Sequence, residues 1–300
     1  MFRTLRIGLC GHMTDIHLVL GGTGKTGTRL TRQLVAGGAT ARPGSRTPST
    51  PSAGVQPVRF DWDDDSTWGH ALEGVTGVYL VPPALRMDHP PLLGAFAEQA
   101  LAAGARRLVL LSARGVDAGP DNPLIAAERA VGAVAGNQLT VVRPTWFMQN
   151  FTESFFAPGV ASGALVAPTG NGAVPFVDAD DIAAVAAAAL TADGHGGRLY
   201  ELSGPESLSF AEAAVVLSQY VGHEVRHVDL PVTEWIADAE GNGLSAAYAG
   251  MLGALFSVIR DGHDDHLSTG VQLALGRPST SLAEWARRAA QTRRPIPARP

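Results

Sequence analysis

The chain has 300 residues and a formal net charge of −5, with 45% hydrophobic and 17% charged residues. This is a globular balance, and the charge gives no electrostatic case for binding nucleic acid or an anionic membrane. The single cysteine, Cys10, excludes an internal disulfide framework and a cysteine-rich zinc site. No apolar run is long enough to span a bilayer. We therefore expect a cytoplasmic protein without a metal, and its oligomeric state stays open, a monomer included.

Residues 1–14 lack the long apolar segment of a signal peptide, and we expect them to be a leader without fixed structure. The first predicted strand, residues 16–20, is a short apolar run. Four glycines follow within seven residues, and residues 28–36 then carry apolar side chains at helical spacing. Strand, glycine turn and helix in this order are typical of the start of a dinucleotide-binding domain, where a pyrophosphate lies at the helix N-terminus.

The glycine spacing fits two patterns equally well. Gly22, Gly24 and Gly27 match G-x-G-x-x-G, whereas Gly21, Gly24 and Gly27 match G-x-x-G-x-x-G. A phosphate-binding P-loop is a weaker interpretation, because it needs a glycine where Val19 stands. The cofactor contacts expected in this turn are Gly21, Thr23, Gly24, Lys25, Thr26 and Gly27.

The second predicted strand, residues 39–42, is interrupted by Pro43-Gly44. An NAD enzyme usually carries Asp or Glu at the end of this strand, but none occurs from residue 39 to residue 60. Arg42, Ser45 and Arg46 stand there instead, and a guanidinium group suits a 2′-phosphate. We expect NADP(H) as the cofactor, with Arg46 as the main contact and Ser45 beside it. The alternative is that these arginines belong to a solvated loop.

Two further predicted strands, residues 55–60 and 76–81, end in side chains suited to the cofactor. Asp61 and Trp62 follow the first and are placed to meet the adenine. The second ends abruptly at the carboxyl edge, where open α/β sheets bind their ligands. The contacts expected there are Val81, Pro82 and Pro83.

Strands and helices continue to alternate up to about residue 150. Helices are predicted at residues 89–103 and 122–135, and strands at residues 106–111 and 139–142. This alternation predicts an α/β fold with a Rossmann-type doubly wound parallel sheet over residues 15–150. Pro144 and Thr145, directly after the last of these strands, are further expected cofactor contacts.

The pattern is less regular in residues 151–292, which carry no second nucleotide motif. We expect a smaller C-terminal substrate lobe, interleaved with the Rossmann sheet and followed by a disordered tail, residues 293–300. Asp178, Asp180 and Asp181 precede a predicted helix and are better explained as capping residues than as metal ligands. Residues 263–266, His-Asp-Asp-His, are expected to form a solvated turn.

Several motifs together resemble the NmrA-like atypical short-chain dehydrogenase/reductases. The most specific are Leu-Gly-Gly-Thr-Gly-Lys-Thr-Gly at residues 20–27 and Arg-Pro-Thr-Trp-Phe-Met-Gln-Asn at residues 143–150. The resemblance implies a Rossmann domain, a preference for NADP(H) and a C-terminal substrate lobe. Members of this family reduce quinones, triphenylmethane dyes, ergot-type iminium intermediates or aromatic polyketides, and others bind NADP without turnover as redox sensors. The simocyclinone-type angucyclinone ketoreductases are the branch that the absence of a catalytic motif favours.

The Tyr-x-x-x-Lys motif of classical short-chain dehydrogenases is absent. Lys25 is the only lysine and lies in the glycine turn, and none of the four tyrosines has a lysine four residues later. The helix that should carry the motif has Leu124 and Glu128. Two interpretations remain: a sensor without chemistry, or hydride transfer without a dedicated protein acid, as with a quinone, an iminium or a phenolic ketone.

Ser112 follows the strand at residues 106–111, at the position of the family's active-site serine, and is the one candidate catalytic residue. An aromatic and apolar cluster after residue 145 suits a flat aromatic ligand, although ordinary core packing explains it as well. The expected substrate contacts are Trp146, Phe147, Met148, Phe151 and Phe155. We expect an NADPH-dependent ketoreductase of a polycyclic aromatic metabolite such as an angucyclinone, in antibiotic biosynthesis.

Overall fold

The computed structural model describes residues 15–83, 88–116 and 122–292; the predicted leader and tail lie outside these ranges. Seven parallel strands form the central sheet in the order β3-β2-β1-β4-β5-β6-β9. The order reverses between β1 and β4, which is where sheets of this type bind ligands. The strands are β1 (Ile16–Leu20), β2 (Thr40–Ser45), β3 (Val58–Arg59), β4 (Val75–Leu80), β5 (Arg107–Leu111), β6 (Leu139–Pro144) and β9 (Leu199–Leu202).

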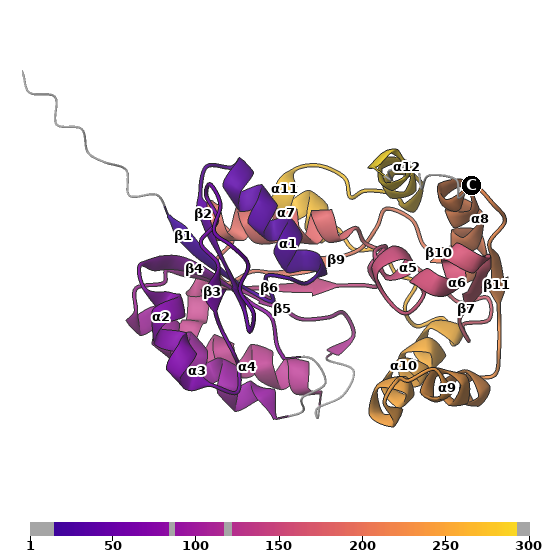
Figure 1. Ribbon diagram of the computed structural model, residues 1–300, viewed down its shortest axis with the longest axis horizontal. Helices are drawn as coiled ribbons and strands as arrows, with labels where there is room; N and C mark the ends of the chain where they lie inside the picture. Colours follow the sequence, from indigo (N-terminus) through magenta and orange to yellow (C-terminus); the bar gives the residue numbers. More distant parts are fainter. Residues whose placement is uncertain (1–14, 84–87, 117–121, 293–300) are drawn as a thin grey trace, which may run out of the picture.

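Helices cover both faces of this sheet, as Figure 1 shows. One face packs against α1 (Lys25–Ala36), α7 (Ala179–Thr191) and α11 (Gly270–Leu275). The other packs against α2 (Trp68–Leu72), α3 (His89–Ala102) and α4 (Pro123–Ala135), with the 3₁₀ turns η1 (Asp65–Thr67) and η3 (Gly136–Gln138) beside them. The predicted Rossmann-type doubly wound fold is therefore confirmed.

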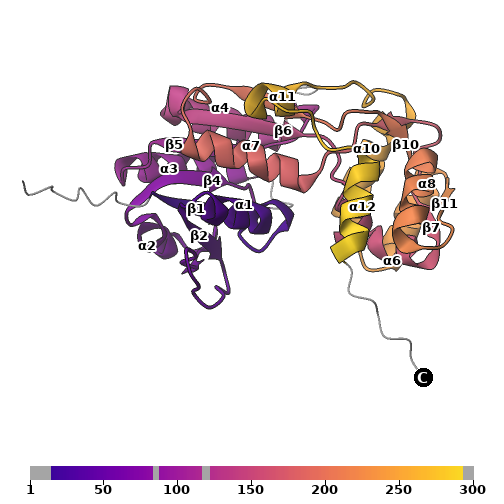
Figure 2. The ribbon, with the colours of Figure 1, turned by 90° about the horizontal axis from the view of Figure 1, so that it is seen from above.

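A lobe with its own apolar core lies beyond the carboxyl ends of the strands (Figure 2). Two small strand pairs, parallel β7–β11 and antiparallel β8–β10, contribute to it. Its elements are α5 (Asn150–Glu153), α6 (Ala157–Ser162), β7 (Ala164–Val166), β8 (Ala173–Val174), β10 (Leu208–Ser209), α8 (Phe210–Val221), β11 (Arg226–Val228), α9 (Val232–Gly241), α10 (Ala246–Arg260) and α12 (Leu282–Thr292).

The lobe and the sheet are interleaved along the chain. After the first lobe elements, the chain returns to cover the sheet with α7 and to extend it with β9, which pairs with β6. It then builds β10 to α10 of the lobe, returns once more as α11, which packs beside α7 and β9, and ends in the lobe with α12. No helix in the described part of the chain is both long and apolar enough to cross a membrane.

The second and third strands differ from their predicted extents. β2 continues through Pro43-Gly44 to Ser45, whereas β3 is only two residues long. The N–H and the C=O of Ala41 both form backbone hydrogen bonds with the segment before β3. Because the backbone groups of alternate residues in a strand face the same neighbour, the backbone of Pro43 faces this segment too. Proline has no N–H to donate, and the β2–β3 ladder starts only at Gly44. The predicted strand over residues 55–60 is therefore mostly irregular.

Candidate active site

The glycine turn between β1 and α1 is shaped by close backbone approaches. Gly21 has a φ of 63°, which favours glycine. A Cβ on Gly22 would lie 2.5 Å from the Cβ of Pro43, and one on Gly27 would lie 2.2 Å from the carbonyl oxygen of Gly21. Gly24 is the N-cap of α1 and brings no side-chain cap. The first N–H groups of the helix are thus left for a ligand, and the turn fits a dinucleotide pyrophosphate.

A buried tyrosine supports this turn from below. The Tyr79 hydroxyl, on β4, donates to Thr26 Oγ1 at 3.1 Å, and the ring is fully buried. Burial raises the pKa of Tyr79, so the hydroxyl stays protonated. Thr26, one of the predicted cofactor contacts, is only 6% exposed. Its side chain therefore supports the turn from inside the protein. Tyr79 has a structural role and no access to a substrate.

Lys25, at the start of α1, lies near the lobe. Burial lowers its pKa, and the nearby Glu153 carboxylate of α5 partly offsets this. Arg29, one turn later, donates to Glu153 at 2.6 Å and to Asp180 at 3.3 Å. Two ion pairs therefore connect the cofactor-binding helix to α5 and to the N-terminus of α7.

The two arginines of the β2 region have different environments. Arg42 donates to the carbonyl oxygens of Ala71 and Glu73 at 3.1 and 2.6 Å and to Gln56 at 3.2 Å, which fixes the end of α2. Arg46 is exposed just after β2 and has no hydrogen bond or ion pair with any residue that the structure describes. Ser45, before it, is half-buried at the carboxyl end of the strand. Arg46 is therefore the arginine available to a 2′-phosphate.

The predicted adenine contacts stand at the end of β3. The Trp62 ring packs edge-on against Phe60 at 5.0 Å and against Phe96 at 5.4 Å. The Asp61 carbonyl accepts from the Trp68 indole at 3.0 Å. Both predicted residues are half-buried, so part of each still faces solvent, and their contact with adenine stays a prediction.

The carboxyl end of β4 lies against the glycine turn. A Cβ on Gly21 would be 3.4 Å from the Cβ of Val81, so the structure brings these two predicted contacts together. Pro82 and Pro83 follow and are half-buried. Thr23 and Gly24 are exposed at the top of the turn. The contact of these residues with the cofactor stays a prediction.

A buried network of three side chains occupies the end of β5. The Ser112 hydroxyl donates to Glu128 Oε1 at 2.5 Å. Arg143, on β6, donates to the same carboxylate through Nε at 2.9 Å and through Nη2 at 2.7 Å. Ser112, Glu128 and Arg143 are 7%, 8% and 6% exposed. Glu128 thus lies where the resemblance places the lysine of Tyr-x-x-x-Lys, and both of its oxygens accept hydrogen bonds.

The segment at residues 263–266 is exposed, as predicted for a solvated turn, except at Asp264, where Arg114 anchors it. Arg114 donates to the Asp264 carboxylate at 2.6 Å, to the His266 carbonyl at 2.6 Å and to Thr145 Oγ1 at 3.1 Å. The Arg114 side chain is only 3% exposed, and burying a guanidinium requires such partners. Of the predicted cofactor contacts, Thr145 is thus engaged by Arg114, and Pro144 is buried at the end of β6.

The predicted substrate contacts divide by burial. Met148 and Phe151 are 0% and 1% exposed, because they pack into the core of the lobe. Trp146, Phe147 and Phe155 keep partial exposure. Trp146 stacks on Phe256 of α10 at 5.1 Å. Only the three partly exposed residues of this set have surface available to a ligand, and their contact with a substrate stays a prediction.

Asp178 and Asp181 act as structural anchors, and the capping prediction for Asp178 is confirmed. Asp178 accepts from the N–H of Asp180 at 2.9 Å and from the Gln149 amide at 2.7 Å, and Arg288 of α12 also donates to it. Burial raises the pKa of this carboxyl. Asp181 accepts from Arg277 at 2.7 Å. Within the described ranges, no group of three or more His, Cys, Asp or Glu side chains is placed to hold a metal.

These anchors include residues that the sequence analysis missed. Gln149, Arg277 and Arg288 join the lobe and the last helix to the start of α7. Gln149 is completely buried although its amide is polar. A polar residue directly after an apolar aromatic run was the available signal for it, whereas the partners of the two arginines lie about 100 residues away in the chain.

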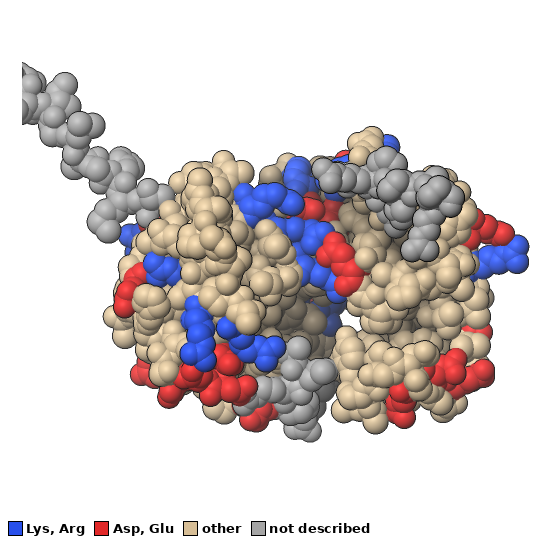
Figure 3. Space-filling view, in the orientation of Figure 1, with Lys and Arg blue, Asp and Glu red and all other residues tan. Residues whose placement is uncertain are grey.

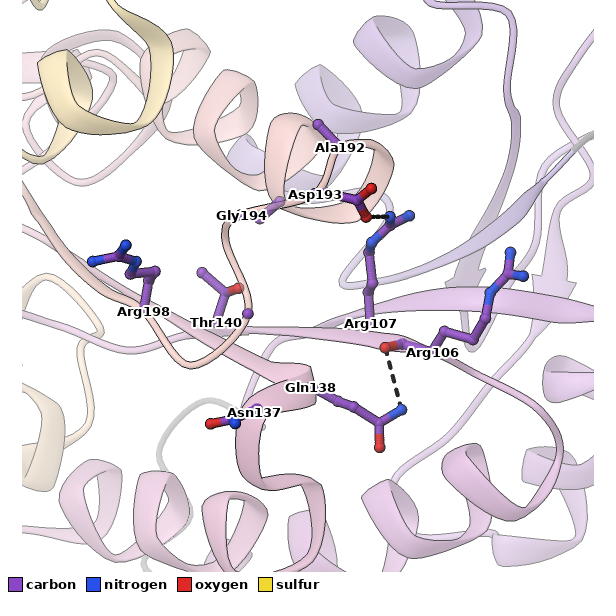
Figure 4. Close-up of a pocket in the computed structure, with 11 residues that line it drawn as sticks. Arg106, Arg107, Asn137, Gln138, Thr140, Ala192, Asp193, Gly194 and Arg198 are labelled. Carbon is purple, nitrogen blue, oxygen red and sulfur yellow. Dashed lines mark hydrogen bonds and ion pairs between the residues drawn. The ribbon is translucent and has the colours of Figure 1, made fainter.

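Hollows occur at both ends of the sheet. Figure 3 shows one between the sheet and the lobe, with Lys and Arg side chains gathered along its upper part. An apolar cavity of about 490 Å³ lies in the lobe, with Phe155 and Trp235 among its lining residues. A polar cavity of about 480 Å³ lies at the opposite, amino edge of the sheet. There Arg107 pairs with Asp193, while Arg106 and Arg198 point apart, so no cationic groups converge on a ligand (Figure 4).

Comparison with known proteins agrees with this geometry. A family profile described as NAD(P)H-binding matches residues 21–193. The uncharacterized oxidoreductase YesF of Bacillus subtilis (strain 168) is 34% identical over 271 residues, covering 90% of this chain and 93% of the relative. Festuclavine synthase I of Penicillium roqueforti (strain FM164) is 32% identical over 271 residues, covering 87% and 93%.

A solved structure shares the fold. An NADPH-dependent quinone oxidoreductase of Escherichia coli, complexed with NADPH, superposes with a TM-score of 0.75 at 23% identity, covering 91% of this chain and 99% of the other. Sheet, glycine turn and relatives together define the class: the protein is an NAD(P)H-dependent oxidoreductase. The chain belongs to the NAD(P)H-binding family that this profile describes.

Proposed function

We propose that this oxidoreductase uses NADPH to reduce the carbonyl group of a polycyclic aromatic metabolite, such as an angucyclinone of an antibiotic pathway. When bound, the cofactor supplies the hydride. The chain supplies the binding turn, an aromatic wall and orientation, and no dedicated proton donor. The observation that carries the proposal is the Ser112–Glu128–Arg143 network, in which Glu128 stands at the position of the usual catalytic lysine.

The preference for NADPH rests on the contrast between the two arginines. Arg42 is committed to backbone carbonyls, whereas Arg46 is exposed and unbonded among the described residues. A free guanidinium beside the end of β2 favours the 2′-phosphate of NADPH, and no carboxylate follows β2 to bind the ribose hydroxyls of NADH. We also propose that the other predicted cofactor contacts at the carboxyl edge of the sheet bind NADPH, because they lie beside the glycine turn.

Two of the four tyrosines are buried, and the other two lie in the lobe, partly buried against its core. Tyr79 is buried below the glycine turn, and Tyr200 is buried beside His195 toward the amino edge. Tyr220 stacks on Trp285 at 5.8 Å, and Tyr248 packs against the core of the lobe. A substrate that stabilises its own alkoxide, through a phenol beside the carbonyl, needs no proton donor from the protein.

The lobe supports a flat aromatic substrate. Trp146 and Phe155 keep exposed ring surface, and rings pack behind them: Trp235 lies 4.8 Å from Phe256 and 6.1 Å from Phe155. Such rings bind planar apolar ligands through large contact areas. We therefore assign the substrate to the space between this aromatic wall and the carboxyl edge of the sheet.

The test is the loss of NADPH absorbance with purified protein and a panel of phenolic polycyclic ketones, their O-methyl ethers, quinones and iminium compounds, run beside NADH. We expect turnover of a phenolic ketone with NADPH and slower turnover with NADH. Turnover restricted to quinones or iminium compounds would replace the ketone by those substrates. Tight NADPH binding without turnover of any compound on the panel would contradict the proposed substrate class.

An iminium or quinone reductase is the second candidate. The Ser112 proton is already donated to Glu128, so the described residues favour substrates that are electrophilic without protonation. The iminium members of the panel decide between the two candidates.

A further inference from the structure

We infer that Ser112 acts as a hydrogen-bond acceptor toward the substrate, so that the site selects polycyclic substrates bearing a free hydroxyl group over their O-alkylated counterparts. The inference rests on the proposed function and refines its substrate class. It follows from the direction of one hydrogen bond at the end of β5.

A serine hydroxyl has one hydrogen and two lone pairs. The Ser112 hydrogen is donated to Glu128 at 2.5 Å. No described residue donates to Ser112 Oγ, so its lone pairs are left for another partner. The residue keeps 7% exposure at the carboxyl end of a central strand.

Glu128 cannot exchange roles with Ser112. Arg143 donates to both carboxylate oxygens, at 2.9 and 2.7 Å, and this bidentate pairing is specific for the ionised group. An ionised carboxylate only accepts hydrogen bonds. Glu128 and Arg143 are also nearly fully buried, which favours hydrogen bonds within this network over bonds to water. Glu128 is thus a positioning residue that fixes the direction of the Ser112 hydroxyl.

This direction has a consequence for specificity. Ser112 cannot donate to the reacting carbonyl while its proton is held by Glu128. It can accept from an O–H or N–H group of the substrate. A substrate whose hydroxyl is methylated would place an ether oxygen against the Ser112 lone pairs and lose the bond. A site with a buried polar group rejects the ligand that leaves it unpaired.

The probes are 2-hydroxyanthraquinone and 2-methoxyanthraquinone, flat tricyclic compounds that differ at one oxygen. Their dissociation constants are measured by quenching of tryptophan fluorescence with the protein saturated in NADP+, so that no turnover occurs. We expect the wild-type protein to bind the hydroxy compound about 5- to 10-fold more tightly, as befits one neutral hydrogen bond.

Three variants test the assignment. Ser112→Ala should abolish the preference for the hydroxy compound without weakening the binding of the methoxy compound. Ser112→Thr, which retains a hydroxyl, should keep the preference. The double variant Glu128→Leu with Arg143→Met should release the Ser112 proton, let it donate to the ether oxygen and bring the two constants together. Thermal unfolding of each variant shows that it is folded, and Ser112→Ala decides the matter if the double variant is not.

Equal binding of the two probes to the wild-type protein would overturn the inference alone. The inference would also be overturned if Ser112→Ala weakened the binding of both probes by the same factor, because the serine would then be a donor to the carbonyl. Failure of both probes to bind the wild-type protein would overturn the polycyclic substrate class, and the inference with it.

Discussion

The sheet half and the lobe are specified in different ways. In the sheet half the site is made by the backbone: Gly22 and Gly27 lie so close to their neighbours that no side chain fits. In the lobe the proposed substrate site is made by side chains, and buried polar partners such as Asp178 with Gln149 hold the neighbouring segment in place. A site made by backbone groups constrains the sequence at its glycines, whereas a site made by side chains is free to change with the substrate.

The largest effect should come from closing the glycine turn. Gly27→Ala would place its Cβ 2.2 Å from the Gly21 carbonyl oxygen, so the turn must shift away from the pyrophosphate. We expect a loss of NADPH affinity of about 100-fold or more, measured by fluorescence titration, because several hydrogen bonds to phosphate are lost together.

The control for this variant is Gly132→Ala in α4, where the nearest atom would be 3.8 Å away. It should bind NADPH as the wild type does and unfold at the same or a higher temperature. Wild-type affinity in Gly27→Ala would show that the turn does not bind the pyrophosphate.

A smaller effect should separate the two arginines after the turn. Arg46→Ala should weaken NADPH binding by about 10- to 100-fold, since it removes a charge-assisted contact, and leave NADH binding nearly unchanged. Arg42→Ala should lower the melting temperature, because it removes the bonds to Ala71 and Glu73, and keep the NADPH-to-NADH ratio. Equal losses for both cofactors in Arg46→Ala would rule out the 2′-phosphate assignment.

The lobe should respond to the loss of ring area at its wall. Trp146→Phe keeps an aromatic ring against Phe256 but reduces the exposed aromatic area. We expect KM for a polycyclic substrate to rise about 3- to 10-fold, in proportion to one weakened aromatic contact, while NADPH affinity stays constant. A change in NADPH affinity with constant KM would place Trp146 with the cofactor.

The smallest effect concerns the sheet at its amino end. His17 on β1 is 1% exposed, and its two ring nitrogens have no hydrogen-bond partner among the described residues. Burial lowers the pKa of His17 below 6.5, with Arg107 and Arg106 acting in the same direction and Asp15 opposing. The unfolded chain therefore binds a proton before the folded protein does, and stability is lost as the pH falls through 6.5.

His17→Leu should flatten this part of the pH dependence, measured by urea unfolding at several pH values from neutral to mildly acidic. Burial also lowers the pKa of His195, so a slope in the same direction remains in the variant. An unchanged slope in His17→Leu would assign the whole dependence to other groups.

The sequence was sufficient for the parts of the structure that local patterns determine. The glycine spacing and the alternation of strands and helices predict the turn and the parallel sheet, and the structure confirms both. The exception within the sheet, β3, depends on which neighbour Pro43 faces, and strand register decides that.

Other features depend on partners that are distant in the chain. Ser112 was identified, but the direction of its hydrogen bond needs Glu128 and Arg143 at known positions. The anchoring of Asp264 by Arg114 joins residues 150 positions apart, and a charged turn gives no sign of it. Burial likewise separates Phe151 from Phe155, although both belong to the same aromatic run.

The position of β9 sets an order of events during synthesis. β6 leaves the ribosome long before residues 199–202, and until then its outer edge has no partner strand. An unpaired edge of apolar residues invites association between chains. A protein shortened after residue 150 would keep that edge open permanently, so the cofactor half should be aggregation-prone when expressed alone. The ribosome must therefore synthesise about two thirds of the chain before the last strand, β9, can pair with β6 and complete the central sheet.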